Sequence, residues 1–416
     1  MIRPTTPRPW AARATGRGAL VLLVGAMLAS ALAPRPSAAA GTAGARPASE
    51  NLLQNPGFET GGLLAPAGWD TTLAGLPTVL FYWDPEVHHS GSRSAAIVNA
   101  GDIMPIWHNW NQLLLHAGRL QGRDLELSVW VKSAQMGGRG YVMLQCYRDT
   151  VTLYAKDQGL TRDRARYLMG FHLADDPQIE LGWARKYFST DLDDWTEMKV
   201  RCYVPPSTDL VAVRFGIYGS GQVWFDDAQL TAEPARPVPP YPLGRNLLAN
   251  PSFEEPINDW EFSMPPTPGA RIEADSTTAH SGHYSVLLTM TEKPVVQGFV
   301  NACQVFNTRA LSGKRVRLSG WVKLEDLSHS SAYLSVFSTG LYGSQGHPVP
   351  DAVSGTCDWT VQSMDFDVPK NSYTVWARVG YTADVGKVWW DDVKFEVLGD
   401  TPGAVVPAAR RRARKG

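Results

Sequence analysis

Hydrophobic and polar residues alternate one by one along several short segments of the chain. The pattern is clear in 125–132, in 211–218 and in 316–323, where every second residue is apolar. A period of two residues places successive side chains on opposite faces of a strand, whereas a helix repeats every 3.6 residues. Gly, Pro and Ser turns separate these segments, and no helical periodicity competes with them. The sequence therefore predicts an all-β protein built from β-sandwiches.

A set of sequence landmarks occurs twice, in the same order. The opener NLLQNPGFE returns as NLLANPSFE, the turn HSGSRS as HSGHYS, and the closing strand VWFDDAQL as VWWDDVKF. Between them, two strands end in WVK, and two Trp-Thr pairs precede a further strand. A chain of 416 residues exceeds what one hydrophobic core usually serves. We therefore expect a tandem of two related β-sandwich domains.

The repeats and the composition between them set the expected domain boundaries. The first domain spans 51–231, with an insertion at about 148–194, and the second spans 246–398. The connecting segment 232–245 is rich in proline, which favours a stiff, extended linker. The final segment 399–416 carries the basic run RRRARK and is expected to be disordered, with a cell-envelope contact as its alternative role.

The first forty residues have the features of a secretory signal peptide. Four arginines precede an apolar stretch from Ala19 to Ala33, and Ala38-Ala39-Ala40 offers a cleavage site after Ala40. The stretch is shorter than the roughly 20 residues that span a bilayer, so an uncleaved anchor is the weaker alternative. The sequence predicts a secreted, extracellular mature protein without a membrane span.

Charge and cysteine content narrow the classes of function. The chain has 39 basic and 40 acidic residues, which gives no reason to expect a nucleic-acid partner. Export permits disulfides, so Cys146 with Cys202 and Cys303 with Cys357 are the favoured bridges, one in each domain. Four buried free thiols are the alternative. No CxxC spacing supports a zinc site.

The ordered set of motifs resembles the carbohydrate-binding modules of the CBM4/9/22 type. The resemblance covers most of 51–230 and 246–398 and implies two β-jelly rolls of galactose-binding-like topology. It also implies a structural Ca²⁺ in each domain, a hard cation that prefers oxygen ligands. Carried over, the ligands are Glu59, Ser92 and Asp226 in the first domain, and Glu254, His283 and Asp391 in the second.

Two features bear on that metal prediction. Ser92 and His283 would contribute only their carbonyl oxygens, and histidines stand at positions 89 and 280, where the family often has an acidic side chain. The absence of that acid predicts a weaker site. In the alternative interpretation, Glu59 and Glu254 bind only the backbone of the neighbouring turn.

Aromatic side chains are the main candidates for a ligand surface, because sugars present flat C–H faces to aromatic rings. The candidates from both domains are Trp83, Trp107, Trp110, Trp130, Tyr141, Tyr147, Trp183, Trp321, Tyr333, Trp376 and Arg378. Trp130 and Trp321 occupy the same position in the two repeats, so they are either platforms or core residues. The insertion is either a wall over the groove of the first domain or a flap that packs against the second.

No catalytic motif stands out, since GxSxG, HEXXH and phosphate-binding loops are absent. The two repeats also occupy most of the chain. The sequence favours a secreted, non-catalytic carbohydrate-binding protein that recognises a polysaccharide or glycan. Two alternatives stay open: an extracellular structural or adhesive protein that binds protein partners, and a jelly-roll glycoside hydrolase or lyase that uses the insertion of the first domain.

Overall fold

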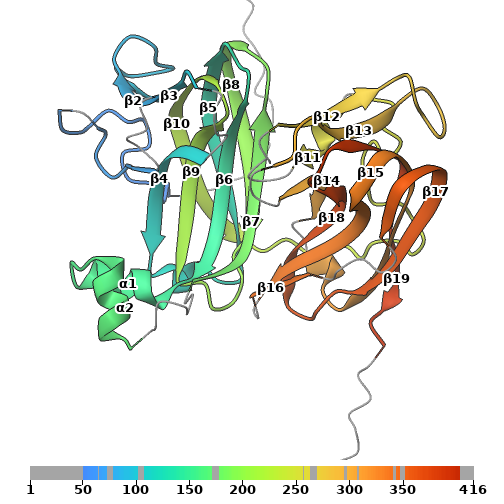
Figure 1. Ribbon diagram of the computed structural model, residues 1–416. Helices are drawn as coiled ribbons and strands as arrows, with labels where there is room; N and C mark the ends of the chain where they lie inside the picture. The colour runs from blue at the N-terminus through green and yellow to red at the C-terminus, as the bar shows by residue number, and fades with distance from the viewer. Residues whose placement is uncertain are drawn as a thin grey trace, which may run out of the picture. The chain divides into compact units, whose positions relative to one another are not determined.

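The structure is a computed structural model that describes most of the chain between residues 50 and 402 (Figure 1). The described residues are 50–63, 65–72, 78–101, 107–170, 178–255, 257–262, 269–294, 298–306, 309–340, 343–346 and 352–402. The predicted signal peptide and most of the predicted basic tail lie outside them. Residues Ser49–Gly416 form one compact unit.

The first domain consists of two antiparallel sheets of five strands each. We call one the front sheet; its order is β1 (Asp70–Thr72), β4 (Trp107–Leu115), β9 (Leu210–Tyr218), β6 (Arg139–Arg148), β7 (Ile179–Phe188). The other is the back sheet, with the order β2 (Val79–Asp84), β3 (Ser94–Asn99), β10 (Gly221–Pro234), β5 (Arg123–Ala134), β8 (Leu192–Tyr203).

The second domain has the same two layers, linked by one long bent strand. Its strands are β11 (Glu261–Phe262), β12 (Ala270–Asp275), β13 (Ser285–Met290), β14 (Phe299–Phe306), β15 (Lys314–Gly340), β16 (Gly343–Gly346), β17 (Val353–Asp367), β18 (Ser372–Thr382) and β19 (Gly386–Asp400). The first half of β15 pairs with β17 and β19, whereas its second half pairs with β18 and β16. The strands β11, β14, β18, the second half of β15 and β16 therefore form the front layer.

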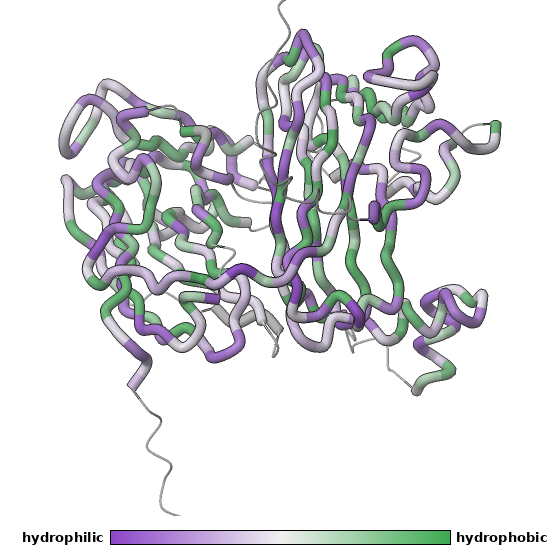
Figure 2. Tube along the Cα trace, turned by 180° about the vertical axis from the view of Figure 1, so that it is seen from behind, coloured by the Kyte–Doolittle hydropathy of each residue, from purple (hydrophilic) through white to green (hydrophobic). Residues whose placement is uncertain are grey.

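The alternating sequence pattern sets which side chains enter the core. Leu125, Leu127, Val129 and Val131 of β5 are fully buried, while the residues between 126 and 132 that alternate with them are only partly buried. Hydrophobic and hydrophilic positions accordingly alternate along many of the strands (Figure 2). Buried apolar residues fall into two large clusters, one within 53–230 and one within 248–397. The all-β prediction is confirmed, and each repeat has its own core.

The insertion of the first domain contains helices that the strand pattern did not predict. It holds α1 (Thr150–Asp157), α2 (Arg162–Leu168) and then strand β7. Asp149 and Thr161 cap the two helices by accepting hydrogen bonds from Thr152 and Arg164. Short 3₁₀ turns, η1 (Ala117–Leu120), η2 (Ile257–Asp259) and η3 (Arg309–Leu311), complete the described elements. None of the helices in the described part of the chain is long and apolar enough to cross a membrane.

The structure contains neither of the favoured disulfide bridges, and all four cysteines are free thiols. Cys303 lies on the outer face of the front layer, next to Trp183 and Trp376, whereas Cys357 packs against the core of the second domain. The two side chains therefore lie on different sides of a layer. Cys146 and Cys202 are both buried in the core of the first domain, and both thiols approach the Tyr203 carbonyl oxygen.

Candidate functional site

Three residues on adjacent front-sheet strands of the first domain lie in one row. Gly216 of β9 pairs in register with Asn109 of β4 on one side and with Tyr141 of β6 on the other. A Cβ atom at Gly216 would lie 2.5 Å from the Tyr141 ring and 2.3 Å from the His108 carbonyl oxygen. Only glycine therefore leaves room for the tyrosine ring to lie across the strand.

The second domain repeats this row in its front layer. Gly380 of β18 pairs with Asn301 of β14 and with Tyr333 of β15. A Cβ atom at Gly380 would lie 2.5 Å from the Val300 carbonyl oxygen. We call this arrangement the Asn–Gly–Tyr rung. Its presence at the same register in both domains makes it the feature on which the candidate site is built.

An arginine accompanies each rung. Arg214 and Arg378 precede the rung glycine by two residues on the same strand, so they lie on the same face. Both are half-buried, and among the described residues neither Nε atom has a hydrogen-bond partner. The Arg378 guanidinium lies over Phe337, 4.9 Å from the ring centroid. Each arginine thus places a cationic donor fork beside an amide and a phenol, which in the first domain are fully buried.

Burial controls the ionisation of the polar groups on this face. It raises the pKa of Tyr333 to about 12 and raises that of Tyr141 further, so both phenols stay neutral hydroxyl groups. Burial also raises the pKa of Glu180, against the opposing effect of a 3.0 Å hydrogen bond from Gln145. The face therefore combines neutral donors with arginine and an acid whose pKa is raised by burial. Such groups can bind several hydroxyls of one ligand.

The surroundings of the two rungs differ. In the second domain, Phe299 is 58% exposed and its ring meets Tyr333 edge-on at 6.1 Å. Its counterpart in the register is Trp107, whose side chain lies outside the described residues. In the first domain, Tyr141 contacts Tyr187 edge-on at 6.4 Å and is fully buried. An exposed aromatic side chain therefore adjoins the rung of the second domain.

Several predicted aromatic residues are buried rather than presented to solvent. Trp183 and Trp376 pack against each other at 5.2 Å, and Tyr147 lies in a small cluster on the front sheet of the first domain. Trp110 belongs to the core, whereas Trp83 is only half-buried and donates to the Phe58 carbonyl oxygen. Strand β7 thus carries Trp183 against the front layer of the second domain, which supports the flap interpretation of the insertion.

Trp130 and Trp321 lie on the back sheets, away from the rungs. Each is half-buried and stacks on a histidine of the HSGxxS turn, Trp130 on His89 at 4.2 Å and Trp321 on His280 at 4.0 Å. His89 in turn bonds to Asp227 at 2.6 Å, and His280 bonds in the same way to the equivalent Asp392 at 2.7 Å. The histidine covers one face of each indole. The two tryptophans are therefore neither fully exposed platforms nor fully buried core residues.

The predicted calcium ligands form hydrogen bonds to the turn in both domains. The Glu59 carboxylate accepts from the Ser92 amide at 2.9 Å and from its hydroxyl at 2.7 Å. Asp226 accepts the amides of His89 and Ser90, at 2.7 and 3.2 Å. In the second domain, Glu254 binds the amides of His283 and Tyr284, which lower its pKa, and Asp391 binds that of His280.

This set of donors does not fit a cation, because N–H groups point at the carboxylate oxygens that would have to face it. Within the described ranges, no group of three or more His, Cys, Asp or Glu side chains is placed to hold a metal ion. The contacts support the alternative in which these acids bind the turn backbone. Calcium stays a prediction from the resemblance.

The rung residues Asn109, Asn301, Arg214 and the two glycines were missed in the sequence. Two short motifs that occur once in each repeat could have indicated them. These motifs are N-x-x-Q, which begins at 109 and 301, and R-x-G, which begins at 214 and 378. The glutamine of the first motif also has a role in the fold. Gln112 bonds to the backbone of Gln54, as Gln304 does to that of Ala249, and so fixes each opener to the front layer.

Comparison with known proteins finds no matching family model. One curated relative, an uncharacterized HTH-type transcriptional regulator YbfP of Bacillus subtilis (strain 168), is 27% identical over 151 residues, 36% of this chain. The chain spans about half (51%) of the length of that relative.

The solved structures that are similar to the chain are mainly carbohydrate-binding modules. The CBM22 tandem domain of Paenibacillus barcinonensis Xyn10C aligns with 86% of this chain and 100% of its own, at 14% identity and a TM-score of 0.30. A CBM22 module of Clostridium thermocellum Xyn10B covers 38% of this chain and 97% of its own, at 15% and 0.31. A putative sugar-binding protein of Bacteroides thetaiotaomicron covers 44% and 100%, at 16% and 0.30. Because these TM-scores are low, the fold is assigned from the sheets described above and not from the comparison.

Proposed function

We propose that this chain is a secreted, non-catalytic carbohydrate-binding protein, with a polysaccharide or glycan bound on the front faces of its domains. The observation that carries the proposal is the duplicated Asn–Gly–Tyr rung with its arginine. In the second domain, where Tyr333 and Arg378 are half-buried, amide, guanidinium and phenol groups lie side by side and match the alternating donors and acceptors of sugar hydroxyls. In the first domain Asn109 and Tyr141 are fully buried, and Arg214 is the half-buried group of that face. Two further similar structures are the CBM22-1 xylan-binding domain of Paenibacillus barcinonensis Xyn10C and TmCBM61 in complex with β-1,4-galactotriose. Both of these ligands belong to the proposed class.

A binding role fits the acids near this face better than a catalytic one. A glycosidase needs two carboxyl groups on either side of the scissile bond. Glu180 is held by Gln145, and Glu261 forms an ion pair with Arg185. Each of these acids is thus engaged by another side chain. Secretion is supported by the composition of residues 1–40 and completes the proposal.

The test is affinity electrophoresis of the mature chain through gels that contain xylan, galactan or β-glucan. Phe299→Ala removes the exposed ring beside the second rung, and Tyr284→Ala removes another exposed ring, which precedes β13 of the same domain. We expect retardation by at least one polysaccharide, weakened several-fold by Phe299→Ala and unchanged by Tyr284→Ala. Free migration in every gel by a folded protein would contradict the proposal and favour a protein-binding role.

A further inference from the structure

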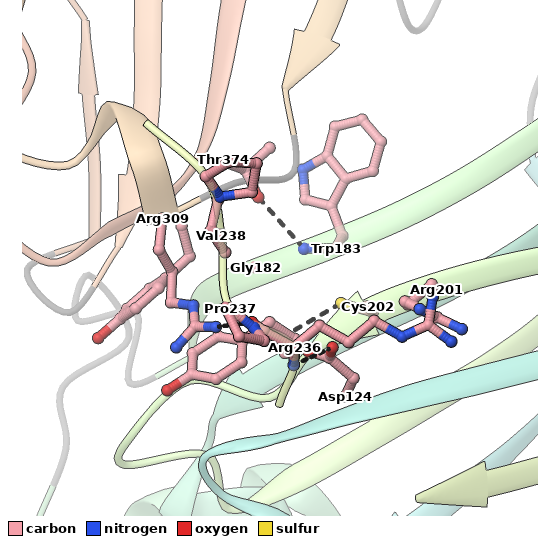
Figure 3. Close-up of a pocket in the computed structure, with 13 residues that line it drawn as sticks. Asp124, Gly182, Trp183, Arg201, Cys202, Arg236, Pro237, Val238, Arg309 and Thr374 are labelled. Carbon is pink, nitrogen blue, oxygen red and sulfur yellow. Dashed lines mark hydrogen bonds between the residues drawn. The ribbon is translucent and has the colours of Figure 1, made fainter. Parts of the chain in front are cut away.

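A cavity of about 320 Å³ is lined by none of the rung residues (Figure 3). Its lining comes from β5, β7 and β8 of the first domain, from the linker, and from η3 and β18 of the second, all within the compact unit Ser49–Gly416. The volume is at the lower end of the range of small-molecule sites, about 300–1,000 Å³. It is large enough for a small ligand.

Arginine dominates the charge of the lining. Arg201, Arg236 and Arg309 line the cavity, together with the acidic Asp124. Arg201 forms an ion pair with Glu126, and Asp124 accepts the backbone amide of Arg236 at 2.9 Å. The guanidinium groups of Arg236 and Arg309 form no ion pair among the described residues. The cavity therefore favours an anion.

The Arg309 side chain is fixed before any ligand arrives. Its guanidinium lies over the Tyr203 ring at 3.9 Å, and Nη2 donates to the Arg236 carbonyl oxygen at 3.1 Å. Its Nε atom is buried and has no hydrogen-bond partner in the described part of the chain. A planar guanidinium held in this way can bind a carboxylate at little further entropic cost.

The remaining walls suit the body of a small polyol. Tyr203 and Tyr373 lie 5.8 Å apart at 36°, and Pro237, Val238 and Pro239 of the linker add a stiff apolar side. Asp124 is buried on the polar side, where its carboxylate can accept a hydrogen bond from a hydroxyl group. Cation, acceptor and apolar wall together select a ring that carries both a carboxylate and hydroxyls.

We propose that this cavity, which we call the linker cavity, binds a carboxylated sugar such as a uronate, with the carboxylate on Arg309 and ring hydroxyls on Asp124 and Arg236. The site is separate from the rungs and does not depend on the function proposed for them. It would also connect ligand binding to the linker, since Pro237, Val238 and Pro239 form one wall.

Calorimetric titration with D-galacturonate and with D-galactose tests the proposal, because the two rings differ only in the carboxylate. We expect galacturonate to bind at least about tenfold more tightly than galactose, and Arg309→Met to remove most of that difference, since charge-assisted hydrogen bonds are lost. Arg236→Gln, which changes an exposed side chain, should weaken galacturonate binding about threefold to tenfold without altering the fold.

The controls separate this site from other sources of binding. Arg164→Gln changes an exposed arginine on α2, away from the cavity, and should leave the titration unchanged, as should Phe299→Ala on the rung face. Equal binding of the two sugars, no binding of galacturonate, or unchanged binding by both cavity variants would overturn the proposal. Competition by inorganic phosphate at equal concentration would make this an inorganic-anion site and overturn the sugar assignment.

Discussion

The two front faces carry the same rung, yet they differ in the strand that flanks it. In the first domain the neighbour of β6 is β7, a ten-residue strand supplied by the insertion. In the second domain the corresponding half of β15 has the four-residue β16 beside it. The added strand brings Trp183 onto Trp376, while the second domain keeps Phe299 exposed. The comparison teaches that a duplicated site can keep its polar centre while its rim changes.

The largest effect should come from breaking the contact that the added strand makes. Trp183 is 4% exposed and packs with Trp376 and Cys303. Trp183→Ala should lower the free energy of unfolding by about 3–5 kcal/mol, the usual cost of deleting a buried tryptophan. Urea denaturation followed by fluorescence measures it. The half-buried Trp195→Ala is the control and should cost clearly less; equal losses would show that the contact has no special role.

Substituting the rung glycines tests whether the two rungs are equivalent. Gly216→Ala and Gly380→Ala place a Cβ within 2.5 Å of a carbonyl oxygen in each domain. Each should cost about 1–3 kcal/mol through overpacking, and Gly216→Ala should also displace the Tyr141 ring. Thermal unfolding of both variants would show this. Gly118→Ala, with no atom within 4 Å of the new Cβ, should be near neutral, and a similar loss there would contradict the steric argument.

The pH dependence should distinguish the first rung from the second. Burial raises the pKa of Glu180, which accepts a hydrogen bond from Gln145 beside the first rung. In the second domain the position equivalent to Gln145 is occupied by Phe337, which cannot donate such a hydrogen bond. An acid whose pKa is raised by folding stabilises the fold below its unfolded pKa and loses that effect as the pH rises through its folded pKa.

Glu180→Gln should therefore raise the melting temperature at pH 7, and the gain should shrink as the pH falls towards about 4.5. Calorimetry at pH 7, 6 and 5 measures the difference between variant and parent. A gain that grows on acidification would show that burial does not control this carboxyl group.

The smallest effect is expected at the HSGxxS turns, where the domains agree. Glu59→Gln removes the charge that accepts the Ser92 and Arg93 amides, and should lower the melting temperature by about 2 °C, with or without chelator. Differential scanning calorimetry in calcium and in EGTA measures both conditions. A parent protein that loses stability in EGTA, while Glu59→Gln does not, would instead support the calcium prediction.

The strands and the duplication could be predicted from the sequence because they are written in local patterns. The alternation around Val129 and Val322 determines which side chains face the core, and the structure buries both. The helices of the insertion were missed because α1 and α2 are only eight and seven residues long. Together the two helices contain only three buried residues. So short a segment leaves almost no periodic signal.

The site was harder to predict because a strand pattern identifies a face but not what covers that face. Tyr141, Tyr333 and Arg378 were expected on an outer face, and they lie there, the two tyrosines within the rungs and Arg378 beside the second rung. Trp183 and Trp376 also lie on outer faces, but each is buried by the other, a contact between distant parts of the chain. Similarly, nothing local to Trp130 indicates that His89 stacks on it.

The central claim, that the front faces of both domains bind carbohydrate, is tested most directly by one double-mutant comparison. Affinity for a retained polysaccharide is measured for the parent, for Arg214→Met, for Arg378→Met and for the double variant. We predict that each single change weakens binding about tenfold at its own domain, and that the double variant no longer binds. Undiminished binding by a folded double variant would contradict the account and place the ligand elsewhere on the molecule.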